Sequence, residues 1–268
     1  MYCLRTDMRR ALTSWGFVVG AAGMAAAAFF GVLEEIIPVF QGQMEGGLPP
    51  GYSIQLTITS LKSEVMLLVL PILCALPFTT AFVDDYKSKY LRGYLCRAGR
   101  RDYTISRVTA TAVSGGMTLL VGVALICVLF SIVFTPMEVV VQETDTAALT
   151  QSVEEIDVSA QVTFVDLLGR ALLFFLSGAL WSLVGALLAT ATMSKYMAYA
   201  SPFIFYYVLV ILSDRYFLDV YVLNPREWLN PSELWNAGIW GAVLLVLELI
   251  VILSALYALF IQRRLRDV

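Results

Sequence analysis

The sequence predicts an all-α membrane protein with six transmembrane helices, and three observations support this. Hydrophobic residues make up 59% of its 268 residues and charged residues only 15%, whereas soluble domains average about 45–50% and about 25%. The hydrophobic residues gather in six stretches, each near the length of about 20 residues with which a helix crosses about 30 Å of hydrocarbon. The Lys and Arg residues fall almost entirely in alternate connections between these stretches, as they do in multi-pass membrane proteins.

The chain opens with a segment that favours an amphipathic N-terminal helix. Leu4, Met8, Ala11 and Leu12 recur at helical spacing, and arginines occupy a neighbouring face. We expect residues 1–14 either to form a helix at the membrane surface or to serve only as a basic topology signal.

Six predicted spans follow. They cover residues 15–33, 65–83, 111–134, 171–193, 197–213 and 239–260. The first also fits a cleaved signal peptide, because a basic start leads into an apolar run with four consecutive alanines. We expect the second to bend, because Pro71 and Pro77 each remove a backbone donor and crowd the preceding turn. The fifth is the shortest, and Pro202 lies near its start.

The connection between the last two spans is too apolar for a free loop and too interrupted for a further span. It runs from residue 214 to residue 235, with two Asn-Pro steps beside Trp228 and Trp235. Such a pattern predicts short interfacial or re-entrant helices.

Small residues at a spacing of four predict close helix packing. Gly16 and Gly20 lie on one face of the first span, and Gly178 and Ser182 lie on one face of the fourth. The adjacent glycines 115 and 116 in the third span are interpreted in the same way.

The distribution of charge predicts the orientation. Fourteen of the 18 Lys and Arg residues lie before the first span, between the second and third, between the fourth and fifth, or after the sixth. The other four, on the opposite side, are Lys62, Arg170, Arg215 and Arg226. Because cytoplasmic connections carry the excess of positive charge, we expect both termini in the cytoplasm and the acidic connection between the third and fourth spans outside. No repeat or linker divides the chain, so residues 1–268 are predicted to form a single transmembrane domain.

The residue types restrict the chemistry of the chain. It has no histidine, and no Gly-Lys-Ser or Gly-Lys-Thr step that would form a P-loop for nucleotide phosphates. The pair Glu34-Glu35 lacks the downstream Arg and the histidines that intramembrane proteases of the paired-glutamate type need. The net charge of −3 gives no general attraction to nucleic acid. We therefore expect no catalytic, cofactor or metal site and no nucleic-acid partner, and we expect the four cysteines to be free thiols.

The connection between the second and third spans is the most informative segment. Phe82, Tyr86, Tyr90 and Tyr94 recur every four residues, which lines one helical face with aromatic rings while basic residues occupy the others. Asp102 is expected to cap a helix that restarts there and runs into the third span. From the residues alone, this pattern also fits ordinary positive-inside charge with interfacial tyrosines.

This segment resembles the type-two class of ATP-binding-cassette (ABC) permeases, the six-helix membrane subunits of bacterial exporters. In that family the second helix ends in an acidic residue, a glycine follows, then a basic turn with small residues, and then a Tyr and a basic residue lead into the third helix. The matching positions here are Asp84 or Asp85, Gly93, the turn from Arg97 to Arg101, Tyr103 and Arg107. The family's last basic residue is often Lys, so Arg107 is a mild departure. The likeness covers the whole chain in topology but only this connection in motif.

The resemblance implies a function and partners. In the family this connection docks into a groove of a separate ATPase subunit, which binds ATP and magnesium, and transmits its closure to the membrane helices. The resemblance thus implies an exporter of the bacterial plasma membrane that works with a second permease subunit and moves a peptide, lipid or drug-like substrate. It implies a coupling surface made of Asp84, Asp85, Tyr86, Tyr90, Gly93, Tyr94, Arg97, Arg100, Arg101, Tyr103 and Arg107.

Other functions stay open. The chain also fits a non-transporting membrane scaffold or sensor, whose basic connection recruits a different cytosolic partner or anionic lipid. A membrane-embedded enzyme fits least, because histidine and paired intramembrane acids are absent. A charge near the middle of a bilayer costs about 2.5–3.5 kcal/mol, so we expect Glu248 in the sixth span to face the bundle interior, to be protonated or to lie near a cavity.

Overall fold

The computed structural model describes residues 2–41, 52–89, 91, 93, 95, 99–134, 164–217, 220–229, 231 and 238–266, and every regular element in them is a helix. Four of these helices contain stretches long and apolar enough to cross a membrane. They are α8 (Arg100–Val133), α9 (Phe164–Thr192), α10 (Lys195–Tyr216) and α12 (Gly238–Arg266). Two bent helix pairs raise the number to six if each pair forms one span. The prediction of a helical, multi-pass architecture is confirmed at this level.

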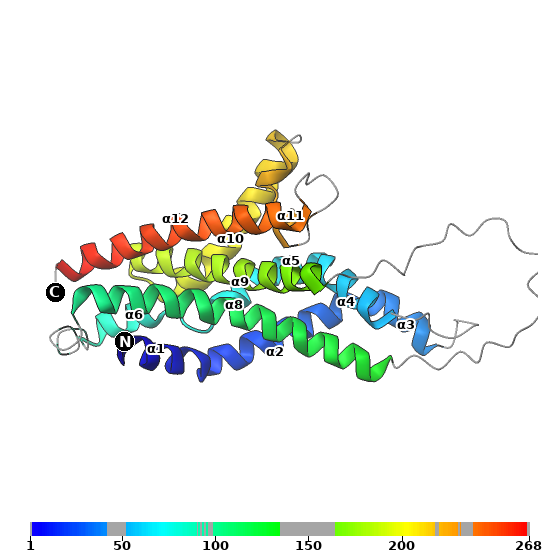
Figure 1. The fold of residues 1–268 in the computed structure, drawn as a ribbon, viewed down its shortest axis with the longest axis horizontal. Helices are drawn as coiled ribbons and strands as arrows, with labels where there is room; N and C mark the ends of the chain where they lie inside the picture. Colours follow the sequence, from blue (N-terminus) through cyan, green and yellow to red (C-terminus); the bar gives the residue numbers. More distant parts are fainter. Residues whose placement is uncertain are drawn as a thin grey trace, which may run out of the picture.

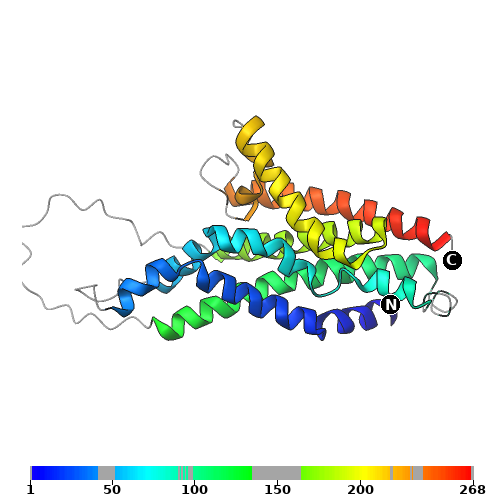
Figure 2. The ribbon, with the colours of Figure 1, turned by 180° about the vertical axis from the view of Figure 1, so that it is seen from behind.

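The helices form an elongated bundle with α8 and α9 at its centre (Figure 1). Helix α8 packs against α9, α2, α1 and α4, and α12 packs along α9. Both chain termini lie at one end of the bundle, beside α6, whereas α3 (Leu33–Phe40) and α4 lie at the other end (Figures 1 and 2). We call the end that carries the termini, α6 and the start of α8 the basic end.

The predicted N-terminal helix is present as α1 (Tyr2–Leu12), which meets α2 (Trp15–Phe30) at a bend of 46°. Ser14 separates the two, and its hydroxyl accepts a hydrogen bond from the Phe17 backbone N–H at 3.1 Å, capping α2. The side of α1 that is buried against the bundle carries Asp7 and Ala11, while Leu4 of the predicted apolar row is 38% exposed. Helix α1 is therefore attached to the bundle through a charged residue.

The prediction of one continuous second span over residues 65–83 is wrong. Helix α4 (Tyr52–Lys62) and helix α5 (Glu64–Ala75) meet at a bend of 74°, and after a turn at residues 76–80 the chain continues as α6 (Ala81–Lys87). Ser63 accepts a hydrogen bond from the Met66 backbone N–H and so starts α5. Pro77 has no N–H to continue α5, so the helix ends just before it. The 74° bend lies at Ser63, before the predicted span, whereas α5 continues through Pro71; of the two prolines, only Pro77 coincides with a break in the helix.

The third span begins earlier than predicted. Helix α8 starts at Arg100, so it extends well beyond the membrane-length segment toward the basic end. Its N-cap is Gly99, with φ of 75°, a left-handed conformation that glycine adopts without strain. Asp102 lies inside the first turn and is not the cap, so that detail of the prediction is wrong, while the restart of a helix that continues into the third span is confirmed.

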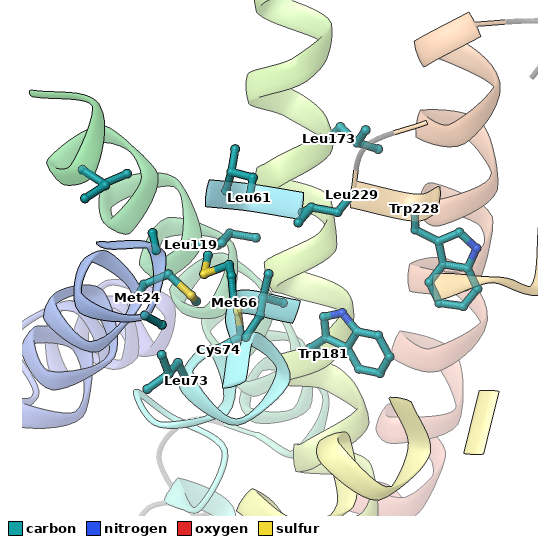
Figure 3. Close-up of a cluster of buried hydrophobic side chains, with 14 of the residues drawn as sticks. Met24, Leu61, Met66, Leu73, Cys74, Leu119, Leu173, Trp181, Trp228 and Leu229 are labelled. Atoms are coloured by element: carbon teal, nitrogen blue, oxygen red, sulfur yellow. The ribbon is translucent and has the colours of Figure 1, made fainter. Parts of the chain in front are cut away.

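Two short helices, η1 (Tyr221–Leu223) and α11 (Pro225–Leu229), occupy the connection between the last two spans, as predicted. The Trp228 indole N–H donates to the Val222 carbonyl at 2.7 Å, and its ring stacks on Trp181 of α9 with centroids 6.2 Å apart. Figure 3 shows both tryptophans within the apolar core, with Leu229 beside them. The connection is thus folded onto the bundle.

The predicted close packing of small residues is confirmed where α8 crosses α9. A Cβ atom added to Gly115 would lie 2.3 Å from the Ser182 Cβ, and one added to Gly178 would lie 2.5 Å from the Gly115 carbonyl oxygen. The Ser182 hydroxyl donates to the Thr111 carbonyl at 3.0 Å. The three described cysteines, Cys3, Cys74 and Cys127, are free thiols, as expected.

Candidate functional site

A buried cluster of charged side chains holds the basic end together. Its centre is Arg107 of α8, which is 2% exposed. The Arg107 Nη2 atom contacts the carboxylate of Asp85 in α6 and lies 3.5 Å from Oδ1 of Asp7 in α1. Three helices that are distant in sequence therefore meet at one guanidinium group.

Each carboxylate has a second partner. The Ser106 hydroxyl donates to Asp7 Oδ2 at 2.6 Å, and Arg10 Nη1 donates to Asp85 Oδ1 at 3.0 Å. Two arginines thus face two aspartates, and the formal charges balance. Arg10 is half exposed, whereas Asp7, Asp85 and Arg107 are all buried. Charges in such surroundings are stable only while they stay paired.

The rings around the cluster help to hold the Arg107 guanidinium in position. Its central carbon lies 5.1 Å from the Phe78 ring centroid and 4.9 Å from the Tyr103 ring centroid. Both distances are within the range of cation–π attraction. The Nε and Nη1 atoms of Arg107 have no hydrogen-bond partner among the described residues.

The cluster closes the base of the connection between α6 and α8. Asp85 and Arg107 are 22 residues apart in sequence, and their contact joins the end of α6 to the second turn of α8. Leu91, within the connection, is 1% exposed and packs with Phe82, Tyr103 and Tyr257. The connection is consequently attached to the bundle at its base by charge and within its length by apolar contact.

Two further contacts surround the cluster. Lys195 at the start of α10 forms an ion pair with Asp84 of α6. Arg264 of α12 donates to the Ala191 carbonyl near the end of α9 at 2.9 Å. Six helices are thus linked at the basic end by charged or polar side chains.

The residues of the predicted coupling surface fall into three groups. Asp85, Tyr103 and Arg107 are buried in or beside the ion cluster, so they hold the connection in place and present no surface to another protein. Asp84 and Tyr86 are half-buried, whereas Gly93, Arg100 and Arg101 are exposed. The remaining three, Tyr90, Tyr94 and Arg97, lie outside the described residues.

Sequence reasoning missed Asp7, Arg10, Ser106 and Phe78. One signal was present for Asp7, because this acidic residue lies four positions before Ala11, on the side of the amphipathic helix that would face the bundle. No signal assigned it Arg107 as its partner.

Glu248 does not face the interior of the described bundle, so that part of the prediction is wrong. It is exposed on the outer face of α12, next to Leu244, Val251 and Ile252, which are 67%, 57% and 50% exposed. One side of α12 is buried because it packs on α9, and Glu248 lies on the opposite side. Protonation and a position near a cavity of a larger assembly stay predictions.

In the described part of the chain, no group of three or more His, Cys, Asp or Glu side chains is placed to hold a metal ion. No protein-family model, no curated protein and no solved structure matches this chain.

Proposed function

We propose that this chain is the membrane subunit of an ABC exporter in a bacterial plasma membrane, with both termini in the cytoplasm. A separate ATPase subunit would bind ATP and magnesium, and a second permease subunit would complete the pathway. The observation that carries the proposal is the buried ion cluster of Asp7, Asp85 and Arg107. It favours a mechanical connection between a cytoplasmic surface and the membrane helices.

A buried ion pair joins the two helices at the base of the connection between α6 and α8. A flexible loop would absorb a push from a partner protein, whereas a loop closed at its base by buried ion pairs moves as one unit with the helices that it joins. Asp85 lies in α6 and Arg107 in α8, and α8 packs against α1, α2, α4 and α9. Force applied to this connection would therefore reach most of the bundle.

The substrate path is proposed to form between two subunits. The cavity enclosed by α5, α9, α10, α11 and α12, beside Ser177 and Trp181, has a volume of about 10 Å³. That volume holds about one water molecule. A single copy in this conformation thus offers no room for a peptide, lipid or drug-like substrate in that cavity.

The test is charge reversal at the exposed start of α8. Arg100→Glu with Arg101→Glu should leave the fold intact, because both side chains are exposed. Reversing charges at a docking surface costs about 2–5 kcal/mol where the pairs become buried. We expect the double variant to lose a P-loop ATPase that co-purifies with the wild-type chain in mild detergent, together with substrate-stimulated ATP hydrolysis.

The matched control is Arg263→Glu, an exposed arginine of α12 that lies outside the connection. It should keep both the ATPase subunit and its stimulated hydrolysis. If the double variant assembles and transports normally, the arginines serve only as topology signals. If repeated purifications of the wild-type chain yield no ATPase, the exporter proposal fails.

The scaffold or sensor is a second candidate, and the small size of the internal cavity favours it. A scaffold would bind its partner through the same exposed arginines but would support no ATP-driven substrate movement. Reconstitution with the co-purified partner in sealed vesicles separates the two, because only an exporter accumulates substrate when ATP is added.

A further inference from the structure

The basic end carries a pocket that is lined by arginine side chains. It has a volume of about 180 Å³ and lies between the first turn of α8 and the last turns of α12. Its lining residues are Arg100, Arg101, Gln262 and Arg266, all exposed. Three guanidinium groups and one amide meet there, and no acidic side chain of the described residues lines the pocket.

The grouping of these arginines favours the binding of an anion. None of the three forms an ion pair within the described part of the chain. Arg266 lies at the C-terminal end of α12, where the helix dipole favours a cation. Arg100 and Arg101, however, occupy the first turn of α8, where the dipole is positive and the first backbone N–H groups have no intrahelical acceptor. An anion in the pocket would neutralise the arginines and lie next to the positive end of the α8 dipole.

The surface next to the pocket is apolar. Ile105, one turn after Arg101 on the same face of α8, is 60% exposed. Leu259 and Ile252 precede Arg266 by seven and fourteen residues, so they lie on its face of α12, and they are 61% and 50% exposed. Ile105 and the apolar strip of α12 thus lie beside the pocket, on helices that are long and apolar enough to span a membrane.

We propose that this pocket binds the phosphate headgroup of an anionic phospholipid, whose acyl chains lie over Ile105 of α8 and the apolar strip of α12. Arginine suits a phosphate headgroup, because the N–H donors of its planar guanidinium group match the geometry of the phosphate oxygens. Ile105 and Leu259 lie roughly 6–10 Å from the pocket along the helix axes, at a rise of about 1.5 Å per residue. A soluble phosphate would use only the pocket, whereas a phospholipid uses the pocket and these apolar side chains together.

The test measures lipid binding by the purified full chain with native mass spectrometry, comparing phosphatidylglycerol with phosphatidylcholine. Arg266→Ala should weaken phosphatidylglycerol binding about five-fold, and Arg101→Ala with Arg266→Ala about twenty-fold or more, since each basic residue near an anionic lipid contributes about 1 kcal/mol. The matched control is Arg9→Ala, which removes an exposed arginine of α1 that does not line the pocket and does not lie on α12. It should leave binding unchanged.

A second experiment tests whether the pocket binds a phospholipid or a free anion. Inorganic phosphate at equal concentration should fail to displace phosphatidylglycerol, and Leu259→Asn should weaken lipid binding without touching the charged pocket. Full displacement by phosphate would overturn the lipid assignment, as would equal losses in Arg9→Ala and Arg266→Ala. Loss of a co-purifying ATPase in Arg266→Ala with lipid binding unchanged would assign the pocket to a protein partner. Arg100 and Arg101 also belong to the proposed ATPase-docking surface, whereas Arg266 lines only this pocket, so the single variant Arg266→Ala tests lipid binding separately from the exporter proposal.

Discussion

Replacement of Arg107 by Met should be the most damaging single change at the basic end. Asp7 and Asp85 would stay buried, and only the half-exposed Arg10 would remain to pair with them. One buried negative charge would be uncompensated. Removing one partner from a buried ion pair costs about 3–5 kcal/mol, whereas loss of an exposed pair costs about 1 kcal/mol or less. The structure therefore predicts a loss of unfolding free energy of about 3–5 kcal/mol for Arg107→Met.

The measurement is equilibrium unfolding in mixed micelles with increasing dodecyl sulfate, followed by helical circular dichroism. Arg263→Met, on the exposed end of α12, is the control and should change the unfolding free energy by less than about 0.5 kcal/mol. Arg107→Lys should fall between the two, because an ammonium group keeps the charge but cannot pair with both carboxylates through a planar fork.

A compensating variant tests whether the cost comes from unpaired charge. Combining Arg107→Met with Asp7→Leu and Asp85→Leu removes all three buried charges, and Arg10 is exposed enough to turn toward water. Replacing a whole buried ion cluster with hydrophobic side chains of similar volume is often close to neutral for stability, so the triple variant should recover most of the loss. A single variant that costs under about 1 kcal/mol, or a triple variant that is worse than the single one, would refute the account of the cluster.

Two further predictions concern packing and topology. Gly115→Val should destabilise the bundle by about 1–3 kcal/mol or more in the same unfolding assay, because a Cβ there would lie 2.3 Å from the Ser182 Cβ; Gly93→Ala, where an added Cβ meets nothing within 4 Å, should be neutral. In a cysteine-free background, a cysteine at Gln142 should react with an impermeant maleimide in sealed cells, and one at exposed Ser88 should react only after permeabilisation. Labelling of position 88 in sealed cells would reverse the orientation.

Properties that add up along the chain were predictable from the sequence. Helices α10 and α12 begin within two residues of the predicted spans, because hydrophobic length alone decides whether a segment can cross a bilayer. The short helices η1 and α11 were also predictable, because the two Asn-Pro steps interrupt that connection and are visible in the local sequence. The glycine contacts of α8 and α9 also follow from a local rule of spacing.

The break in the second span was only half predictable. Pro77 indicated a bend, but the sequence did not show that Ser63 would start a separate helix at 74° to the preceding one. The angle depends on how α4 and α5 pack against α8 and α9, which is a property of the assembled bundle.

The pairing of charges was decided by the tertiary structure alone. Asp7 and Ser106 are 99 residues apart, and nothing in the spacing of either residue indicates the other. The same is true of Glu248, whose side of α12 is exposed because the opposite side packs on α9. The sequence by itself determined that several segments are long and apolar enough to span a membrane and where the basic connections lie, because hydrophobicity and charge depend on short stretches of sequence. Which charged residues become buried depends on which helix faces meet, and that is determined only when the whole bundle packs.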